Sequence, residues 1–179
     1  MKDIIYNYDY LDDSDINNQV FRVKALIINS KDEILLGYAN KTYQCVGGHV
    51  EAGEELMDAL SREIREESGI ILNDLDLRPF FRMKYYNRNY PEVGLNTLTI
   101  NSFYIIRTDL EPNPDKMELM DYEKEWGYEV KYLPKDKALD ILYASLDDAK
   151  KKNPVLDTIE AVSEFLRQSE DDTRRDEWR

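Results

Sequence analysis

The chain has 179 residues, with 42% apolar, 24 basic and 37 acidic side chains, so its formal net charge is −13. This length suits one domain, and the acidity disfavours nucleic-acid polymers and anionic membranes, which are bound by Lys and Arg side chains that displace counterions. No apolar run approaches the roughly 20 residues that cross a bilayer. The single cysteine, Cys45, excludes an internal disulfide framework and, with an acidic start that does not fit a secretory signal, favours the reducing cytoplasm.

Acidic side chains gather at the N-terminus and in one internal segment. Residues 1–15 hold five acidic residues against one lysine, and residues 48–70 hold seven against two arginines. We expect an acidic N-terminal arm over 1–16, one folded domain over 17–168 and a charged, frayed tail over 169–179. An anionic substrate could enter the internal segment only together with cations.

Apolar and β-branched residues are concentrated in five segments, which predicts strands. These segments are 20–28, 33–38, 77–88, 98–107 and 128–133. Helical periodicity predicts helices over 54–68 and 135–143 and a last helix that begins at Asn153-Pro154, and Gly69 stands where a left-handed C-cap belongs. The polar stretch 111–121 is predicted to be an excursion. Strands mixed with helices indicate an α/β or α+β fold.

The helix predicted over 54–68 carries acidic residues on its apolar side. At about 100° per residue, Leu56, Leu60 and Ile64 form one buried stripe. Glu67 points between the two leucines, and Glu63 borders the same stripe. The opposite face, which we expect to be solvated, is formed by Asp58, Ser61, Arg62 and Arg65.

Three glutamates, Glu63, Glu66 and Glu67, therefore crowd the last turns of this helix. Like charges three or four residues apart cost roughly 0.2–0.5 kcal/mol per pair, acids oppose the negative end of the helix dipole, and a carboxylate among apolar groups costs still more. A hard divalent cation, Mg²⁺ or Mn²⁺, would offset these costs. The alternative is a solvated acidic helix on which Arg62 and Arg65 pair with the acids, and geometry alone leaves both readings open.

The same segment resembles a known motif. Gly48, Glu54 and the run Arg62-Glu63-Ile64-Arg65-Glu66-Glu67-Ser68-Gly69-Ile70 match the Nudix box, Gly-x5-Glu-x7-Arg-Glu-U-x-Glu-Glu-x-Gly-U with U a bulky aliphatic residue, at every specified position. The surrounding elements extend the resemblance to the Nudix hydrolase family over residues 17–168. One departure precedes the box, because Val46 stands where many members have the proline of Pro-Gly-Gly.

The resemblance implies an α/β/α sandwich with a mixed sheet, in which the box forms a loop-helix-loop. The implied reaction is hydrolysis of a pyrophosphate bond in a nucleoside diphosphate linked to another group X, with Mg²⁺ or Mn²⁺ as the cofactor. Metal ions neutralise phosphate oxygens and lower the pKa of water, and a nearby carboxylate takes the proton. The expected partner is a nucleotide-derived small molecule.

The resemblance also implies roles for single residues. The implied catalytic residues are Glu54, Arg62, Glu63, Glu66 and Glu67. Among them Glu63, Glu66 and Glu67 are the implied metal ligands, Glu54 is a further ligand or the base, and Arg62 orients a glutamate through a charge-assisted pair.

Family members often have another acid after the box, on a loop that faces the metal ions. Glu123 and Glu125 are both candidates, and the spacing of Glu125 to the next strand favours it as a metal ligand; a solvated loop acid is the alternative. Gly47 and Gly48 are expected to let the loop backbone fold tightly over the helix beside the cofactor. His49, in the same loop, is expected to be a loop or phosphate-contact residue.

Residues outside the box must select the substrate. Arg82 and Tyr86 lie in an aromatic and basic predicted strand that could hold a phosphate and stack a base, and Trp126 could line a base pocket; packing alone is the alternative for each. A second function also stays open, a Nudix-fold module that senses a nucleotide without cleaving it. Such modules tend to lose acids of the box, and here all are present. Whether two copies form a homodimer is open as well.

Overall fold

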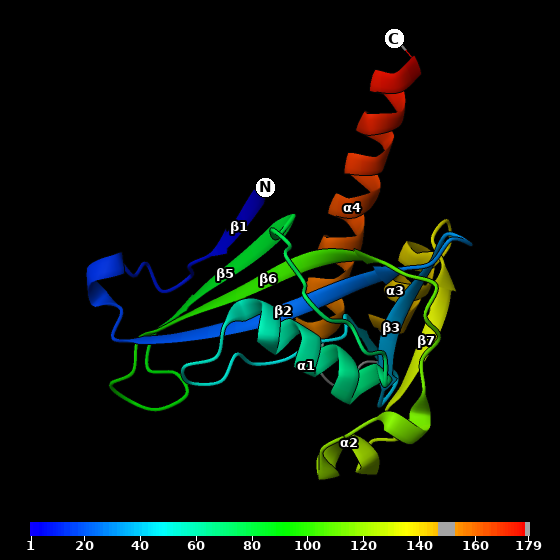
Figure 1. Cartoon of the computed structure of the whole chain (residues 1–179). Helices are drawn as coiled ribbons and strands as arrows, with labels where there is room; N and C mark the ends of the chain where they lie inside the picture. The colour runs from blue at the N-terminus through cyan, green and yellow to red at the C-terminus, as the bar shows by residue number, and fades with distance from the viewer. Residues whose placement is uncertain (147–152, 178–179) are drawn as a thin grey trace.

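The computed structural model describes residues 1–146 and 153–177, which form one mixed sheet with helices on both faces (Figure 1). The strands are β1 Lys2–Tyr6, β2 Asn18–Ile28, β3 Glu33–Ala39, β4 Thr42–Gln44, β5 Phe81–Asn87, β6 Thr97–Arg107 and β7 Glu129–Pro134. The helices are α1 Leu56–Ser68, α2 Asp121–Glu125, α3 Ala138–Leu146 and α4 Asn153–Glu177, with 3₁₀ turns at Asp13–Asp15 and Pro114–Lys116.

The sheet has the strand order β1-β5-β6-β2-β3-β4, and β7 pairs with β3. The pairs β2–β6 and β1–β5 are parallel, whereas β5–β6, β2–β3, β3–β4 and β3–β7 are antiparallel. The long β2–β6 pair forms the centre of this sheet. The α/β class and the mixed sheet are therefore confirmed.

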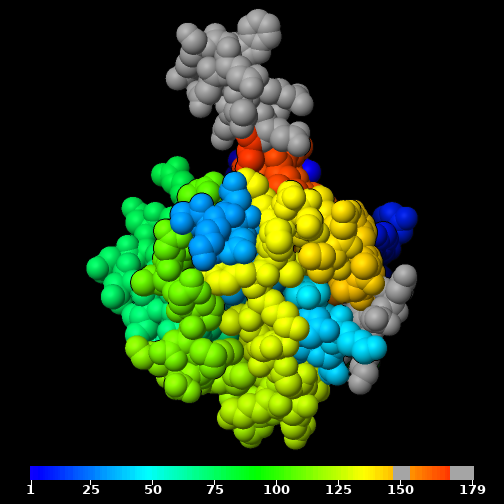
Figure 2. Space-filling view, turned by 90° about the vertical axis from the view of Figure 1, so that its right-hand side faces the viewer, coloured from blue at the N-terminus to red at the C-terminus, as the bar shows by residue number. Residues whose placement is uncertain are grey.

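Side-chain alternation along β2 assigns the two faces of the sheet. Val23, Ala25 and Ile27 pack with α1 in one core cluster, whereas Leu26 and Ile28 pack with α3 and α4 in the other. Because successive side chains of a strand point to opposite faces, a strand buried on both sides reads as a nearly continuous apolar run. This arrangement is the expected α/β/α sandwich. Figure 2 shows the side of the molecule formed by β7 and α3, with α2 at its lower end.

The N-terminal segment, predicted as an acidic arm, contains a strand. Lys2–Tyr6 forms β1, which pairs in parallel with β5 from Lys2↔Phe81 to Tyr6↔Tyr85. Arg82 and Lys84 of β5 bind the Asp3 carboxylate at 2.9 and 3.0 Å, so opposite charges hold the acidic segment on the sheet. The sequence shows both sets of charges but not that they meet.

The last helix extends into the segment predicted as a charged tail. Helix α4 continues to Glu177, and Figure 1 shows it running out beyond the sheet. No glycine or proline follows Pro154, so nothing in the sequence breaks the helix there. Among the described residues no helix is long and apolar enough to span a membrane.

Candidate active site

The loop between β4 and α1 is fixed on strand β2 by backbone hydrogen bonds. Val23 N donates to Gly48 O at 3.0 Å, and Ala25 N donates to Val46 O at 2.7 Å. Gly47 has φ +131°, and a Cβ on it would overlap the carbonyl of Val23, so only glycine fits there. A Cβ on Gly48 would overlap the Glu63 carboxylate. The two glycines therefore let the loop backbone lie directly against β2 and the acidic face of α1.

Helix α1 begins after Glu55 and ends at Gly69, whose φ of 68° and N–H bond to Arg65 O confirm the predicted left-handed cap. Its buried residues are Ala59, Leu60, Ile64, Glu67 and Ser68. Leu56, predicted in the buried stripe, is 40% exposed. Ala59 packs in the core cluster and Leu56 does not, so the buried face of the first turn is rotated from the one that periodicity predicts.

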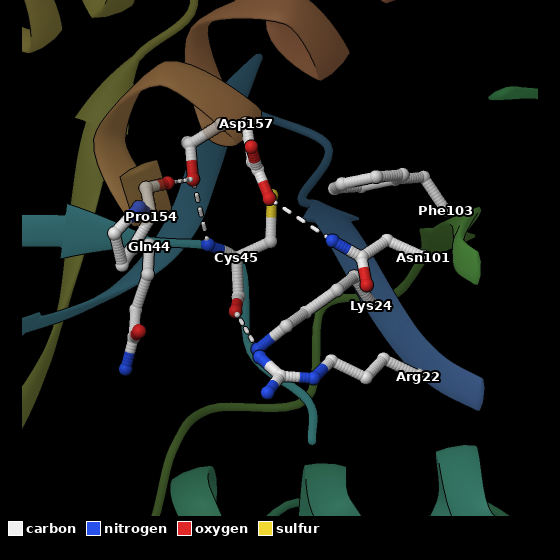
Figure 3. A pocket seen from close by; sticks show the side chains of 9 residues that line it. Arg22, Lys24, Gln44, Cys45, Asn101, Phe103, Pro154 and Asp157 are labelled. Carbon is white, nitrogen blue, oxygen red and sulfur yellow. Dashed lines mark hydrogen bonds between the residues drawn. The ribbon is translucent and has the colours of Figure 1, made fainter. Parts of the chain in front are cut away.

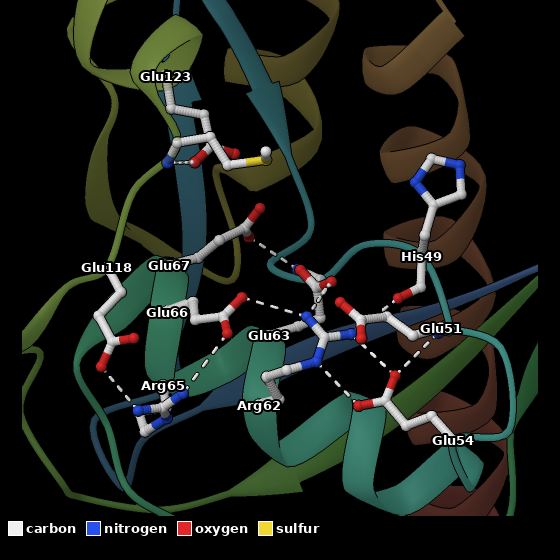
Figure 4. Close-up of polar contacts among 12 residues, drawn as sticks. His49, Glu51, Glu54, Arg62, Glu63, Arg65, Glu66, Glu67, Glu118 and Glu123 are labelled. Atoms are coloured by element: carbon white, nitrogen blue, oxygen red, sulfur yellow. Dashed lines mark hydrogen bonds and ion pairs between the residues drawn. The ribbon is translucent and has the colours of Figure 1, made fainter.

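Arg62 is the centre of the polar network on α1 (Figure 4). Its Nε and Nη2 donate to the two oxygens of Glu54 at 2.8 and 3.0 Å, and its Nη1 donates to Glu63 Oε1 at 2.9 Å and Glu66 Oε2 at 3.1 Å. Nη2 also donates to the backbone oxygen of His49 at 2.9 Å. The hydrogen bond from Arg62 lowers the pKa of Glu54.

This network overturns the prediction of a solvated face for Arg62. The side chain is 22% exposed, because the long guanidinium stem reaches along the helix surface to acids that a helical wheel places well away from its Cα. Since one planar guanidinium binds three carboxylates and the His49 carbonyl, it gathers them in one place. In Figure 4 the His49 imidazole points away from this network, so His49 contributes its backbone.

Glu67 is buried, as the helical pattern predicts. Its Oε2 accepts hydrogen bonds from Gly47 N at 2.8 Å and from Tyr128 Oη at 3.0 Å. The pKa of Glu67 is raised to about 7, mainly by burial and also by the charges of Glu63 and Glu123, while Lys24 and the Gly47 hydrogen bond oppose this rise. Burial likewise raises the pKa of Glu63. The site thus concentrates negative charge that its own cations do not fully compensate.

The donor chemistry of Glu63, Glu66 and Glu67 fits a hard divalent cation, which takes carboxylate oxygens as ligands. Among the side chains that the structure describes, however, no group of three or more acidic, His or Cys residues is already arranged around one ion position. The reason is visible in the network, because Glu63 and Glu66 turn toward Arg62 while Glu67 turns toward Gly47 and Tyr128. A cation would have to draw these carboxylates together.

The two candidate acids after the box differ in burial and contacts. Glu123 is 9% exposed, accepts from Met120 N at 2.8 Å and from Tyr122 Oη at 3.3 Å, and its charge raises the pKa of Glu67. Glu125 is exposed at the end of α2. One sequence signal could have singled out Glu123. It lies three residues after Met120, the N-cap of α2, and a glutamate at that position can cap the helix.

Two of the three predicted substrate residues contact the N-terminal segment instead. Arg82 binds Asp3 through two hydrogen bonds of 2.9 Å, and Tyr86 Oη donates to Asp13 Oδ1 at 2.8 Å. Trp126 follows α2 directly, is 41% exposed, and lies edge-on to the Tyr122 ring at 5.2 Å. Of the three, Trp126 is the one that lies next to an acid of the cluster, because Tyr122 binds Glu123.

A cavity of about 100 Å³ lies on the α4 face of the sheet, and sequence reasoning missed it (Figure 3). Its lining residues are Arg22, Lys24, Gln44, Cys45, Asn101, Phe103, Pro154, Asp157 and Thr158. Lys24 Nζ donates to the carbonyls of Cys45 and Gly47, and Gly47 N in turn binds Glu67, so Gly47 connects the cavity to the carboxylate cluster. The available signal was the pair of cations, Arg22 and Lys24, on one face of an otherwise apolar strand.

A loop-helix-loop that carries this acidic cluster on a mixed sheet between helices defines a Nudix-type domain. A family model described as the NUDIX domain matches residues 19–157, and the chain belongs to that family. This membership supports a hydrolase that acts on pyrophosphate bonds. No curated protein matches the sequence.

Solved structures with the same fold resemble the chain at low identity. MutT from Aliivibrio salmonicida and Vibrio cholerae aligns at 20% identity with a TM-score of 0.50, over 80% of this chain and 94% of that one. The dihydroneopterin triphosphate pyrophosphohydrolase of E. coli aligns at 17% identity with a TM-score of 0.54, over 83% of this chain and 95% of that one. The NUDIX domain of Shewanella oneidensis NrtR, complexed with ADP ribose, aligns at 14% identity with a TM-score of 0.55, over 88% of this chain and 95% of that one. At these identities the likeness shows the fold.

Proposed function

We propose that the protein hydrolyses a pyrophosphate bond in a nucleoside diphosphate linked to another group, and that it needs Mg²⁺ or Mn²⁺. The observation that carries this proposal is the complete acidic box on α1, with Glu63, Glu66 and Glu67 at its end and Arg62 among them. A polyanionic substrate would be repelled by these acids alone, whereas bound cations invert the local sign of the charge.

In this proposal Glu63, Glu66 and Glu67 hold the metal, and Glu123 is the further acid of the site. The metal, when bound, supplies positive charge that neutralises phosphate oxygens and makes water a better acid. Arg62 keeps Glu54 ionised and oriented, since the guanidinium lowers the pKa of that carboxyl. Glu54 is accordingly ionised at neutral pH, which is the form that a general base needs, and in this proposal it takes the proton from the attacking water.

The nucleoside part of the substrate is proposed to enter the cavity that residues of β2 and α4 line. The cavity lining carries charged groups, with Arg22 and Lys24 on one side and Asp157 on the other (Figure 3). Two buried atoms that line it, Arg22 Nε and Asn101 Oδ1, have no hydrogen-bond partner among the described residues. Buried polar atoms without a partner are rare in folded proteins, and a bound base or sugar would supply partners for them.

Two further expectations belong to this proposal. The buried thiol of Cys45, whose pKa burial raises to about 12, is suited to a reducing cytoplasm in which it stays a packing residue. Pairing of two copies into a homodimer remains a prediction, and the mass of the protein in solution tests it.

The decisive experiment is a screen of nucleoside diphosphate derivatives with Mg²⁺ or Mn²⁺, in which the wild type is compared with Glu67→Gln. We expect phosphate-containing products from the wild type and a loss of at least about a hundredfold in the variant, since removal of a charged group from a site that stabilises the transition state costs that much. Equal product release from both proteins would defeat the catalytic assignment. Tight nucleotide binding without turnover would favour the second candidate, a nucleotide-sensing module, for which the ADP ribose complex of the structurally similar NrtR domain is the supporting observation.

A further inference from the structure

The N-terminal strand lies outside the part of the chain that the family model matches, but contacts connect it to residues that line the cavity. That match begins at residue 19, whereas β1 covers Lys2–Tyr6. Strand β1 is bound to two other elements, β5 and α4. It pairs with β5, and Lys2 Nζ binds Glu164 Oε2 of α4 at 3.1 Å. It therefore contacts both β5 and α4, and α4 supplies Pro154, Asp157 and Thr158 to the cavity lining.

A chain of contacts leads from β1 to the cavity. The Tyr6 ring stacks on the Tyr85 ring of β5 with centroids 5.0 Å apart and planes 9° from parallel. Tyr85 Oη donates to Asp157 Oδ1 at 2.5 Å, and Asn101 Nδ2 donates to Asp157 Oδ2 at 3.0 Å. Asp157 and Asn101 both line the cavity. The Asp157 carboxylate is thus held from two sides, one oxygen by each donor.

This arrangement leaves acceptor capacity for a ligand. Each carboxylate oxygen has two lone-pair sites, and each oxygen of Asp157 receives one hydrogen bond in the structure. Beside it the buried Asn101 Oδ1 has no partner among the described residues. Arg22 and Lys24, also in the cavity lining, provide donors. The wall near Asp157 therefore offers acceptors to N–H groups, and the opposite wall offers donors to carbonyl groups.

We propose that Tyr85 is a positioning residue for substrate binding: braced by Tyr6, it fixes Asp157 so that this carboxylate accepts a hydrogen bond from an N–H group of the nucleobase. The proposal rests on the proposed function, because it assigns the base to this cavity. The proposal makes β1 a support of the binding site through Tyr6. It also predicts that the site selects bases that present an amino or ring N–H group beside a carbonyl.

Electrostatics support the same assignment. Burial raises the pKa of Asp157, while the Tyr85 hydroxyl, Lys24, Asn101 and Arg22 lower it. The hydroxyl of Tyr85 consequently favours the ionised carboxylate, which is a stronger hydrogen-bond acceptor than the neutral acid. Without that hydroxyl, Asp157 would be freer to rotate and more readily protonated.

The test compares Tyr85→Phe with Tyr132→Phe. Both changes remove a phenolic hydroxyl, and that of Tyr132 is buried without a partner among the described residues. With the best substrate of the screen, we expect Tyr85→Phe to raise KM about tenfold with kcat within about twofold, the effect of losing one charge-assisted hydrogen bond in binding. Tyr6→Leu should raise KM in the same direction, and Tyr132→Phe should leave KM and kcat unchanged.

A KM for Tyr85→Phe equal to that of the wild type would overturn the proposal. So would equal effects of Tyr85→Phe and Tyr132→Phe, or a fall in kcat that follows the folded fraction, since either result marks a purely structural role. If the wild type hydrolyses none of the compounds, the proposed function fails first. The carboxyl ¹³C signal of Asp157 then decides, because Tyr85→Phe must raise its titration midpoint, and an unchanged midpoint would refute the positioning role.

Discussion

The phenol of Tyr128 donates a hydrogen bond to Glu67 Oε2 over 3.0 Å, in a place where both side chains are buried. Tyr128 precedes β7 and Glu67 ends the acidic row of α1, so this bond joins two segments far apart in the sequence. A Cβ on Gly37 of β3 would overlap the same phenol. Tyr128 therefore fits between β3 and α1, and the buried carboxylate is held away from solvent.

The burial of Glu67 should destabilise the metal-free fold at neutral and higher pH. Its folded-state pKa of about 7 lies above the ordinary 4.5, so its contribution to stability is fully present below about pH 4.5 and is lost as the pH rises through about 7. The shift corresponds to a free energy on the order of 3 kcal/mol. With chelator present, Glu67→Gln should melt above the wild type at pH 8 and near it at pH 5. Parallel pH profiles of melting temperature would count against this.

Arg62 should not be replaceable by lysine. The guanidinium donates to Glu54, Glu63 and Glu66 at once, and an ammonium cannot reproduce that fork. We expect Arg62→Lys to lower kcat at least about tenfold and to lower the melting temperature, since acids gathered at one place lose their common partner. Arg65→Lys serves as control, because Arg65 is more exposed and binds Glu118 at the surface. Similar losses in both variants would contradict the central role of Arg62.

Gly48→Ala should reduce activity while the protein still folds. The added methyl group would meet the Glu63 carboxylate rather than backbone, and a side chain can move away. The expected result is a lower kcat/KM with a small change in melting temperature. Gly53→Ala is an informative comparison, because Gly53 has open space around its Cβ position and only its φ of +81° resists the change. Full activity of Gly48→Ala would show that the position of Glu63 is not critical.

The two acids of α2 can be separated by mutation. Glu123→Gln should lower kcat, because Glu123 is buried and its charge acts on Glu67. Glu125→Gln, a change of the same size on an exposed residue, should be close to neutral. Metal-dependent hydrolysis rates of the two variants measure the difference. A larger loss of activity in Glu125→Gln than in Glu123→Gln would support Glu125 as the metal ligand, as its spacing predicts.

The contact between β1 and α4 predicts sensitivity to acid. Hydrogen bonds from Arg167, Gln168 and Lys2 lower the pKa of Glu164 to about 2. Because the folded-state value lies below the ordinary 4.5, this contribution to stability is present above about pH 4.5 and is lost as the pH falls toward 2. Between pH 5 and 2 the melting temperature of the wild type should fall more steeply than that of Glu164→Gln. Identical slopes would exclude Glu164 as a source of acid instability.

Local sequence signals predicted most strands and helices within a few residues, because binary patterns and caps act over short distances. They did not predict β1, since a short strand at the edge of a sheet is recognised by its partner and not by its own pattern. They also misplaced Leu56 and assigned Arg62 to solvent, because periodicity gives the direction of a Cβ and not the reach of a long side chain.

The sequence by itself determined the family and the kind of chemistry, since the box fixes both the residue types and their spacing along one helix. Only the tertiary structure decided which residues from other elements lie near the box and the cavity. Glu123 and Tyr128 lie beside Glu67, whereas Lys24 and Asp157 line the cavity. The N-terminal acids bind the basic strand that the sequence offered for substrate. These contacts depend on strand order and register, which bring residues that are far apart in the sequence within hydrogen-bond distance. Local sequence patterns do not reveal strand order or register.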